Sequence, residues 1–330
     1  MNRSLVFGRV FACGILASSS SSAATLYVKP AATGNCSSWV LACSLPTAIS
    51  NAVSGDAIWV AAGTYQPFAL INGVKIIGGF AGTETTASQS DPTMNQTIVD
   101  AALTDRCVSS SGEGPTTMLR GFILRNGRAT GTDQWGGGIY LENSSAMIVQ
   151  CVIESCSADY FGGGASIAGT GTPEFINCTF RNNGTGSGNN AHPLGGGGVH
   201  VYSGSPKFTN CLFYGNVAGE GGAVLTVSGN PTFINCTIAN NKAEIGSGGG
   251  VFDQDGTITL QNSIVWGNTS IREGPQMFNA PGYTTTISYS DVQGGYPGTS
   301  NINADPQFLD PGKGDYDIPG TSPCKDVGNN

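Results

Sequence analysis

The centre of the chain alternates apolar and polar residues in short runs, without a continuous helical period. The stretch "PTFINCTIANN" at 231–241 has close copies at 173–183 ("PEFINCTFRNN") and 206–216 ("PKFTNCLFYGN"). A weaker copy, "ITLQNSIVWGN", ends at Asn268. Alternation over so few residues predicts β-strands. Its repetition predicts a stack of similar units.

A glycine-rich element keeps step with these copies. It reads "GGGIYLE" from Gly136, "GGGASIA" from Gly162, "GGGVHVY" from Gly196, "GGAVLTV" from Gly221 and "GGGVFDQ" from Gly248. One unit is therefore a glycine turn, a short alternating strand, a loop and the Asn-Cys strand. A unit of about 25 residues fits one coil of a β-solenoid, in which stacking supplies the core. It is too short for a propeller blade and lacks the ladder of leucine-rich repeats.

The repeated cysteines fall on the apolar face of their strands. They are Cys151, Cys178, Cys211 and Cys236. Such thiols could serve redox or metal chemistry, or they could form an inert ladder in the core, where Cys behaves as a small apolar residue. Ser263 takes the next position of the series. That substitution favours the core ladder.

An asparagine precedes each of the last four of these positions. The four are Asn177, Asn210, Asn235 and Asn262. Asn tolerates the left-handed backbone of a sharp corner, and its amide can bond the equivalent amide of the next coil. The "NCT" triplets at Asn177 and Asn235 also match a glycosylation signal. Periodic placement favours the structural interpretation.

Composition fits a packed, exported chain. Of 330 residues, 39% are hydrophobic and only 11% charged, and the net charge is −8. The apolar content supports a core, and the acidic balance argues against a nucleic-acid partner. Residues 1–24 have the pattern of a signal peptide, with a lipoprotein site at Cys13 as an alternative. We expect a secreted or cell-surface protein with no transmembrane segment.

Export permits disulfides, and Cys36 and Cys43 are the predicted pair. Removal of a leader containing Cys13 leaves nine cysteines, so at least one is free or bonds between chains. No pattern in the sequence indicates a cofactor.

The glycine and Asn elements together resemble the repeats of chlamydial polymorphic outer membrane proteins. The matching stretches are "GGAV" at 221–224, "FRNN" at 180–183 and "FYGN" at 213–216. The ends, "ACSLPTAISNAVSGDAIWVAAGTYQPF" at 42–68 and the segment from "SIVWGN" onward, resemble a broader group of secreted bacterial β-helix proteins. The resemblance implies an all-β fold, a right-handed parallel β-helix of the pectate-lyase-like type. It implies an adhesin-like surface role.

Four regions follow from this layout. Residues 25–55 form an N-terminal cap with a short capping helix at "LPTAISNAV". Residues 56–270 form the coils, and residues 271–330 form closing coils and a C-terminal cap over a monomeric solenoid.

Candidate binding residues lie on the strand after the glycines. Aligning Ile139, Ala165, Val199, Ala223 and Val251 as inward residues places two exposed ladders beside them. The first is Tyr140, Ser166, His200, Val224, Phe252, and the second is Glu142, Ala168, Tyr202, Thr226, Gln254. Aromatic faces beside hydrogen-bonding groups suit sugars or a protein partner, although ordinary strand surface is the alternative. His192, in the insert at 184–196, should lie next to these ladders.

Candidates for chemistry are few. Glu142 and His200 are the catalytic candidates, but a glycosidase needs a second carboxylate, and none accompanies them. Asp253 and Asp255 could bind Ca²⁺ or simply end a strand in a turn. The sequence therefore predicts an exported binding or adhesion module for polysaccharide or a surface. A carbohydrate-active enzyme (lyase or hydrolase) on the same face and a purely structural protein are the alternatives.

Overall fold

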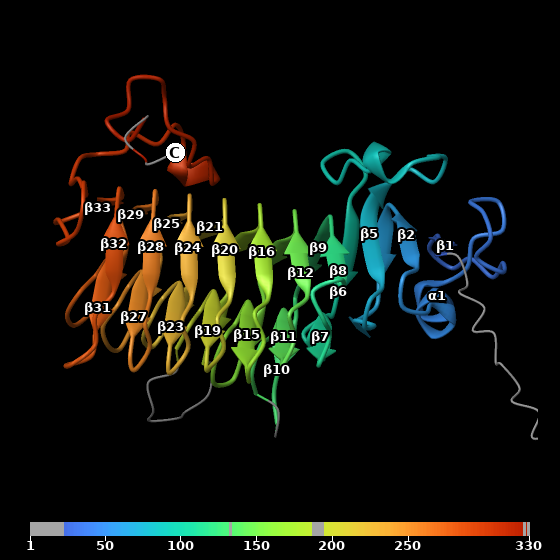
Figure 1. Cartoon of the computed structure of the whole chain (residues 1–330), viewed down its shortest axis with the longest axis horizontal. Helices are drawn as coiled ribbons and strands as arrows, with labels where there is room; N and C mark the ends of the chain where they lie inside the picture. The colour runs from blue at the N-terminus through green and yellow to red at the C-terminus, as the bar shows by residue number, and fades with distance from the viewer. Residues whose placement is uncertain (1–22, 132–133, 187–194, 326–327, 329–330) are drawn as a thin grey trace, which may run out of the picture.

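The computed structural model describes residues 23–131, 134–186, 195–325 and 328. Strands of successive coils stack along the long axis of the molecule and build four sheets (Figure 1). Neighbouring strands in each sheet run parallel. The chain is thus a parallel β-helix, as the repeats predict. The predicted signal at 1–24 lies almost wholly outside the described residues.

The sheets have ten, nine, eight and six strands. The ten-stranded sheet contains β1 (Thr25–Val28), β2 (Ala57–Ala61), β5 (Lys75–Phe80), β8 (Met118–Arg120), β12 (Met147–Val149), β16 (Glu174–Ile176), β20 (Lys207–Thr209), β24 (Thr232–Ile234), β28 (Thr259–Gln261) and β32 (Thr286–Ser288). The nine-stranded sheet contains β3 (Gly63–Tyr65), β6 (Thr97–Asp100), β9 (Phe122–Arg125), β13 (Val152–Glu154), β17 (Thr179–Arg181), β21 (Leu212–Tyr214), β25 (Thr237–Ala239), β29 (Ile264–Trp266) and β33 (Asp291–Val292). The eight-stranded sheet contains β4 (Phe68–Ala69), β7 (Val108–Ser111), β11 (Ile139–Glu142), β15 (Ala165–Ala168), β19 (Val199–Val201), β23 (Val224–Thr226), β27 (Val251–Asp253) and β31 (Met277–Asn279). The six-stranded sheet contains β10 (Arg128–Ala129), β14 (Ser157–Ala158), β18 (Gly184–Thr185), β22 (Val217–Ala218), β26 (Lys242–Ala243) and β30 (Thr269–Ser270).

Matching residues of successive coils stack into ladders inside the solenoid. Phe175, Phe208 and Phe233 stack with ring centroids 4.9 and 4.8 Å apart. These spacings equal the distance between neighbouring strands of a sheet. The repeated cysteines Cys151, Cys178, Cys211 and Cys236 point into the same core and are at most 2% exposed. The thiols therefore contribute apolar volume to the interior.

The predicted asparagines stand at the corner between the ten- and nine-stranded sheets. Asn177, Asn210, Asn235 and Asn262 all have a left-handed backbone, with φ from 52° to 54°. The Asn210 side-chain amide donates to Asn177 Oδ1 at 3.2 Å, and that of Asn235 donates to Asn210 Oδ1 at 3.1 Å. Asn is one of the few residues that adopt this conformation at low cost.

A second asparagine ladder is buried, and the sequence interpretation missed it. Its members are Asn183, Asn216, Asn241 and Asn268, each at most 3% exposed. The Asn183 side-chain amide donates to Asn216 Oδ1 at 3.0 Å, and the amides of Asn216 and Asn241 each donate to the next oxygen at 2.9 Å. The signal was present, because each residue follows the repeated Cys or Ser by the same number of residues.

A helix covers the N-terminal end of the solenoid, and two further segments project from its side. Helix α1 (Leu45–Asn51) packs against β1 and β2, with Ser44 as its N-cap and Leu45 and Ala48 in the core. A disulfide links Cys36 and Cys43 beside it. The segment containing η1 (Ala87–Gln89) and the C-terminal segment containing η2 (Pro311–Lys313) project from the same side of the solenoid (Figure 1). In the described part of the chain, no helix is long and apolar enough to cross a membrane.

Candidate functional site

The outward ladder of the eight-stranded sheet matches the predicted one except in β23, where the chain is shifted by one residue. The structure pairs Val199 with Val224 and His200 with Leu225. Ala223 is instead the last residue of the glycine turn, since its carbonyl accepts from the Val199 N–H at 2.8 Å. Val224 and Thr226 therefore point inward, contrary to expectation. The outward ladder is Tyr140, Ser166, His200, Leu225, Phe252 and Phe278.

His200 was expected at the surface, and the structure corrects this: it is only 1% exposed. Phe161 stacks on the imidazole at 4.6 Å, and Trp135 meets it edge-on at 5.6 Å. Both covering residues stand directly before the glycine turn, at a position that recurs from coil to coil but varies in residue type. A strand position that faces outward is therefore covered here by its neighbouring coils.

Burial controls the chemistry of this imidazole. It lowers the pKa of His200 to about 3, so the ring is neutral at pH 7. Nδ1 lies 3.0 Å from the hydroxyl oxygen of Ser166, and Nε2 has no hydrogen-bond partner among the described residues. Ser166 is also fully buried. The pair supports the floor of the site rather than meeting solvent as an acid or base.

An aromatic pocket opens above this floor. It has a volume of about 630 Å³, and its aromatic lining is Trp135, Tyr160, Phe161, Tyr202 and Phe252. Trp135 and Tyr202 lie 5.2 Å apart, and Tyr202 is 45% exposed. This size and composition are typical of small-molecule and sugar sites. We call this group the aromatic pocket.

Two non-aromatic polar side chains, Gln254 and Glu220, line the aromatic pocket. Gln254 lies at the rim and is exposed. Glu220 is half-buried, and burial raises the pKa of its carboxyl, while the charge of Arg272 partly opposes this rise. The described lining contains no Lys or Arg.

The predicted binding residues are divided by the structure. Tyr202, Phe252 and Gln254 line the aromatic pocket, with His200 beneath it. Tyr140 does not line it, and its ring is covered by the Arg106 guanidinium at 4.8 Å. Glu142 is exposed at the end of β11, also outside the lining. His192 lies outside the described residues. Sequence reasoning missed Trp135, Phe161 and Glu220. All three stand directly before the glycine turn of their coils, and that shared position was the available signal.

The two candidate calcium ligands do not share a site. Asp253 is fully buried on the inward side of β27, where Oδ1 accepts from the Gly256 N–H at 2.9 Å. Burial raises the pKa of its carboxyl, and its Oδ2 has no hydrogen-bond partner in the described part of the chain. Asp255 is exposed and lies beside Tyr283, whose pKa it raises. Among the described residues, no three His, Cys, Asp or Glu side chains form a metal-binding group.

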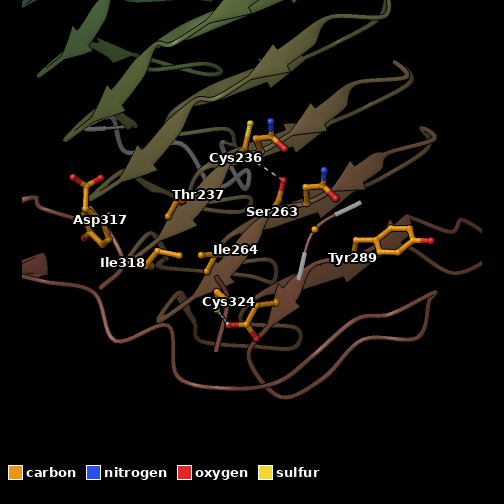
Figure 2. A pocket seen from close by; sticks show the side chains of 13 residues that line it. Cys236, Thr237, Ser263, Ile264, Tyr289, Asp317, Ile318 and Cys324 are labelled. Carbon is orange, nitrogen blue, oxygen red and sulfur yellow. Dashed lines mark hydrogen bonds between the residues drawn. The ribbon is translucent and has the colours of Figure 1, made fainter. Parts of the chain in front are cut away.

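A second, narrower cavity lies under the C-terminal segment (Figure 2). Its volume is about 280 Å³, and Cys236, Ser263 and Cys324 are among the residues around it. The Cys324 thiol donates to Asp291 Oδ2 at 3.0 Å, and burial raises the pKa of Cys324 to about 12. The pKa of Cys236 is raised as well, again by burial. Neither sulfur is a thiolate nucleophile at neutral pH.

Comparisons with known proteins agree with this architecture. The family described as "right handed beta helix region" matches residues 108–285. The crystal structure of pectate lyase Pel9A is similar, with a TM-score of 0.54 and 15% sequence identity, over 86% of this chain and 73% of that chain. No curated protein matches. The predicted fold is confirmed, and the chain belongs to the right-handed parallel β-helix family.

Proposed function

We propose that this chain is an exported polysaccharide-binding module and that the aromatic pocket is its binding site. The observation that carries the proposal is the set of rings from different coils around one opening, with Tyr202 exposed. Flat aromatic faces pack against the apolar faces of sugar rings, and Gln254 and Glu220 supply hydrogen bonds at the rim. The similarity to a pectate lyase agrees with a carbohydrate ligand for this fold.

The charge of the pocket favours a neutral glycan. A polyuronate carries a carboxylate on each sugar and needs cationic partners, as Arg and Lys are for carboxylates. The described lining offers none and adds the acidic side chain of Glu220. Repulsion and the cost of burying unpaired charge both act against an acidic chain.

The first prediction concerns the pocket rings. Trp135→Ala and Tyr202→Ala should each weaken binding to neutral polysaccharide about tenfold, because each removes a stacking surface worth about 1.4 kcal/mol. A glycan array of neutral and acidic chains identifies the ligand, and affinity electrophoresis measures the loss.

Trp266→Ala is the matched control, since Trp266 lies on β29 in the nine-stranded sheet, away from the pocket lining. It should bind like the wild type. Equal losses in all three variants, or preferential binding of polyuronate, would contradict the proposed site. No retention on any glycan would favour the purely structural alternative.

The enzyme alternative has one supporting observation. Glu220 is a carboxyl with a raised pKa beside aromatic rings, as a general acid would be. A glycosidase also needs a second carboxylate, and the described lining has none. Release of reducing or unsaturated ends from a bound glycan, lost in Glu220→Gln, would establish this alternative.

A further inference from the structure

The buried asparagine ladder ends at a pair of cysteines. The backbone N–H of Cys156 donates to Asn183 Oδ1 at 3.0 Å, so Cys156 occupies the next position of the ladder. One coil earlier, the equivalent residue is Gly127, since Arg128 pairs with Ser157 in the next position. Gly127 has no side chain to continue the ladder.

The sulfur of Cys107 and the Gly137 carbonyl both lie close to the side-chain position that Gly127 lacks. A Cβ on Gly127 would lie 3.0 Å from Cys107 Sγ. The Gly127 N–H in turn donates to Cys156 Sγ at 3.4 Å, so both sulfurs, which are free thiols in this structure, lie against Gly127. Two sulfurs thus meet at one residue, from positions far apart in the sequence.

This pair differs from the other buried cysteines. Cys151, Cys178, Cys211 and Cys236 occupy one repeated strand position. Cys107 and Cys156 fall outside that series and are 0% and 1% exposed. At the end of the buried asparagine ladder, two sulfurs lie together where the other coils have a contact between two asparagine side-chain amides.

We propose that Cys107 and Cys156 form a disulfide between the coil that begins at β7 and the coil that contains β13. In this reaction one thiol loses its proton and attacks an oxidising disulfide, such as oxidised glutathione, releasing one thiol of that oxidant. The second cysteine loses its proton and displaces the second thiol. One oxidant disulfide is reduced to two thiols as the two cysteines become one disulfide.

The bond forms during folding, while the coils are open. The contact with Cys156 and burial together raise the pKa of Cys107 in the folded chain. Thiolate is the attacking species, and an enclosed thiol also excludes the oxidant, so exchange in the finished solenoid is slow. The disulfide between Cys36 and Cys43 shows that the fold accommodates such bonds elsewhere.

The test is peptide mapping of wild-type protein refolded in reduced and oxidised glutathione. The protein is alkylated in denaturant without reductant and digested with trypsin and a Glu-specific protease. Cleavage after Arg106, Glu113, Glu154 and Glu174 separates both cysteines from all others. We expect fragment 107–113 linked to fragment 155–174, and reduction should separate them.

Two variants sharpen this test. In Cys156→Ser, Cys107 should become fully alkylated, whereas Cys178→Ser, which removes a ladder thiol, should leave the linked fragment unchanged. Alkylation of both wild-type cysteines while Cys36 and Cys43 remain bonded would overturn the proposal. A link from either cysteine to any third cysteine would overturn it as well.

Discussion

The imidazole of His200 is neutral because aromatic rings replace water around it. Phe161 covers one face, and Trp135 meets it at an edge. A charged ring in this position would lose its hydration, and no carboxylate among the described residues is hydrogen-bonded to it. The cost of protonation inside the fold is therefore a direct measure of how well the rings exclude water.

This cost predicts how stability depends on pH. The pKa of His200 is about 3 in the folded chain, below its ordinary value of 6.5. Between these two pH values, the unfolded chain binds a proton at His200 and the folded chain does not. The contribution of neutral His200 to the free energy of unfolding is fully present above pH 6.5. It is lost as the pH falls toward 3, by about 1.4 kcal/mol per pH unit. Urea unfolding of wild type and His200→Gln should be compared at several values from pH 7.5 to 4.

The variant cannot take up this proton, so its unfolding free energy should fall less steeply with acid. It starts lower at pH 7.5, because the ring contacts are lost, and the two curves approach each other at lower pH. Parallel curves across this range would show that His200 titrates normally.

At the level of elements, the two asparagine ladders are chemically alike and energetically different. The outer ladder at Asn177 and Asn210 turns a corner in contact with water. The inner ladder supplies partners for backbone groups that have no water nearby: Asn216 accepts from the Asn183 N–H at 3.1 Å and donates to the Phe180 carbonyl at 2.9 Å. An unsatisfied buried group costs about 1–3 kcal/mol, whereas water replaces a lost surface bond.

Asn216→Leu should therefore lower the free energy of unfolding by about 4 kcal/mol, since it keeps the size but orphans several buried partners. Asn210→Gly is the control, because it keeps the left-handed corner and loses only the exposed amide bonds. Its loss should be about 1 kcal/mol. Urea midpoints measure both, and similar losses would contradict the assignment of the inner ladder as the stabilising one.

The repeats made the coils and the corner predictable, but not the pocket. Alternation and the Asn-Cys motif determine which residues face the core, and the structure has those strands. The predicted alignment of β23 was wrong by one residue. Ala223 takes the position of the third glycine of the turn, where Gly198 stands one coil earlier. Trp135 and Phe161 cover His200 from the position directly before the glycine turn. That position recurs, but Gly195 and Glu220 occupy it in the next two coils, so the repeat reveals the position and not the aromatic rings.

At the level of the whole molecule, a loss of stability at one end of the solenoid should have little effect on the coils at the other end. Each inner coil contacts the coils on either side, so stability is close to a sum of local terms. The C-terminal segment adds a local cover. Tyr316 packs against Tyr214 at 5.0 Å and Phe308 at 5.1 Å, and its hydroxyl accepts from the Asn240 amide at 3.0 Å.

Tyr316→Ala should therefore loosen one region only. Loss of about 2 kcal/mol of packing should speed amide hydrogen exchange roughly 30-fold in the C-terminal segment and in β21 and β25 beneath it. Exchange in β2 and β5, many coils away, should not change. Tyr283→Ala is the control, since Tyr283 is 39% exposed and its removal exposes little apolar surface. Uniformly faster exchange along the chain would contradict this expectation. It would show that the coils unfold as one cooperative unit, because the loss of one local contact would then lower the stability of every coil equally.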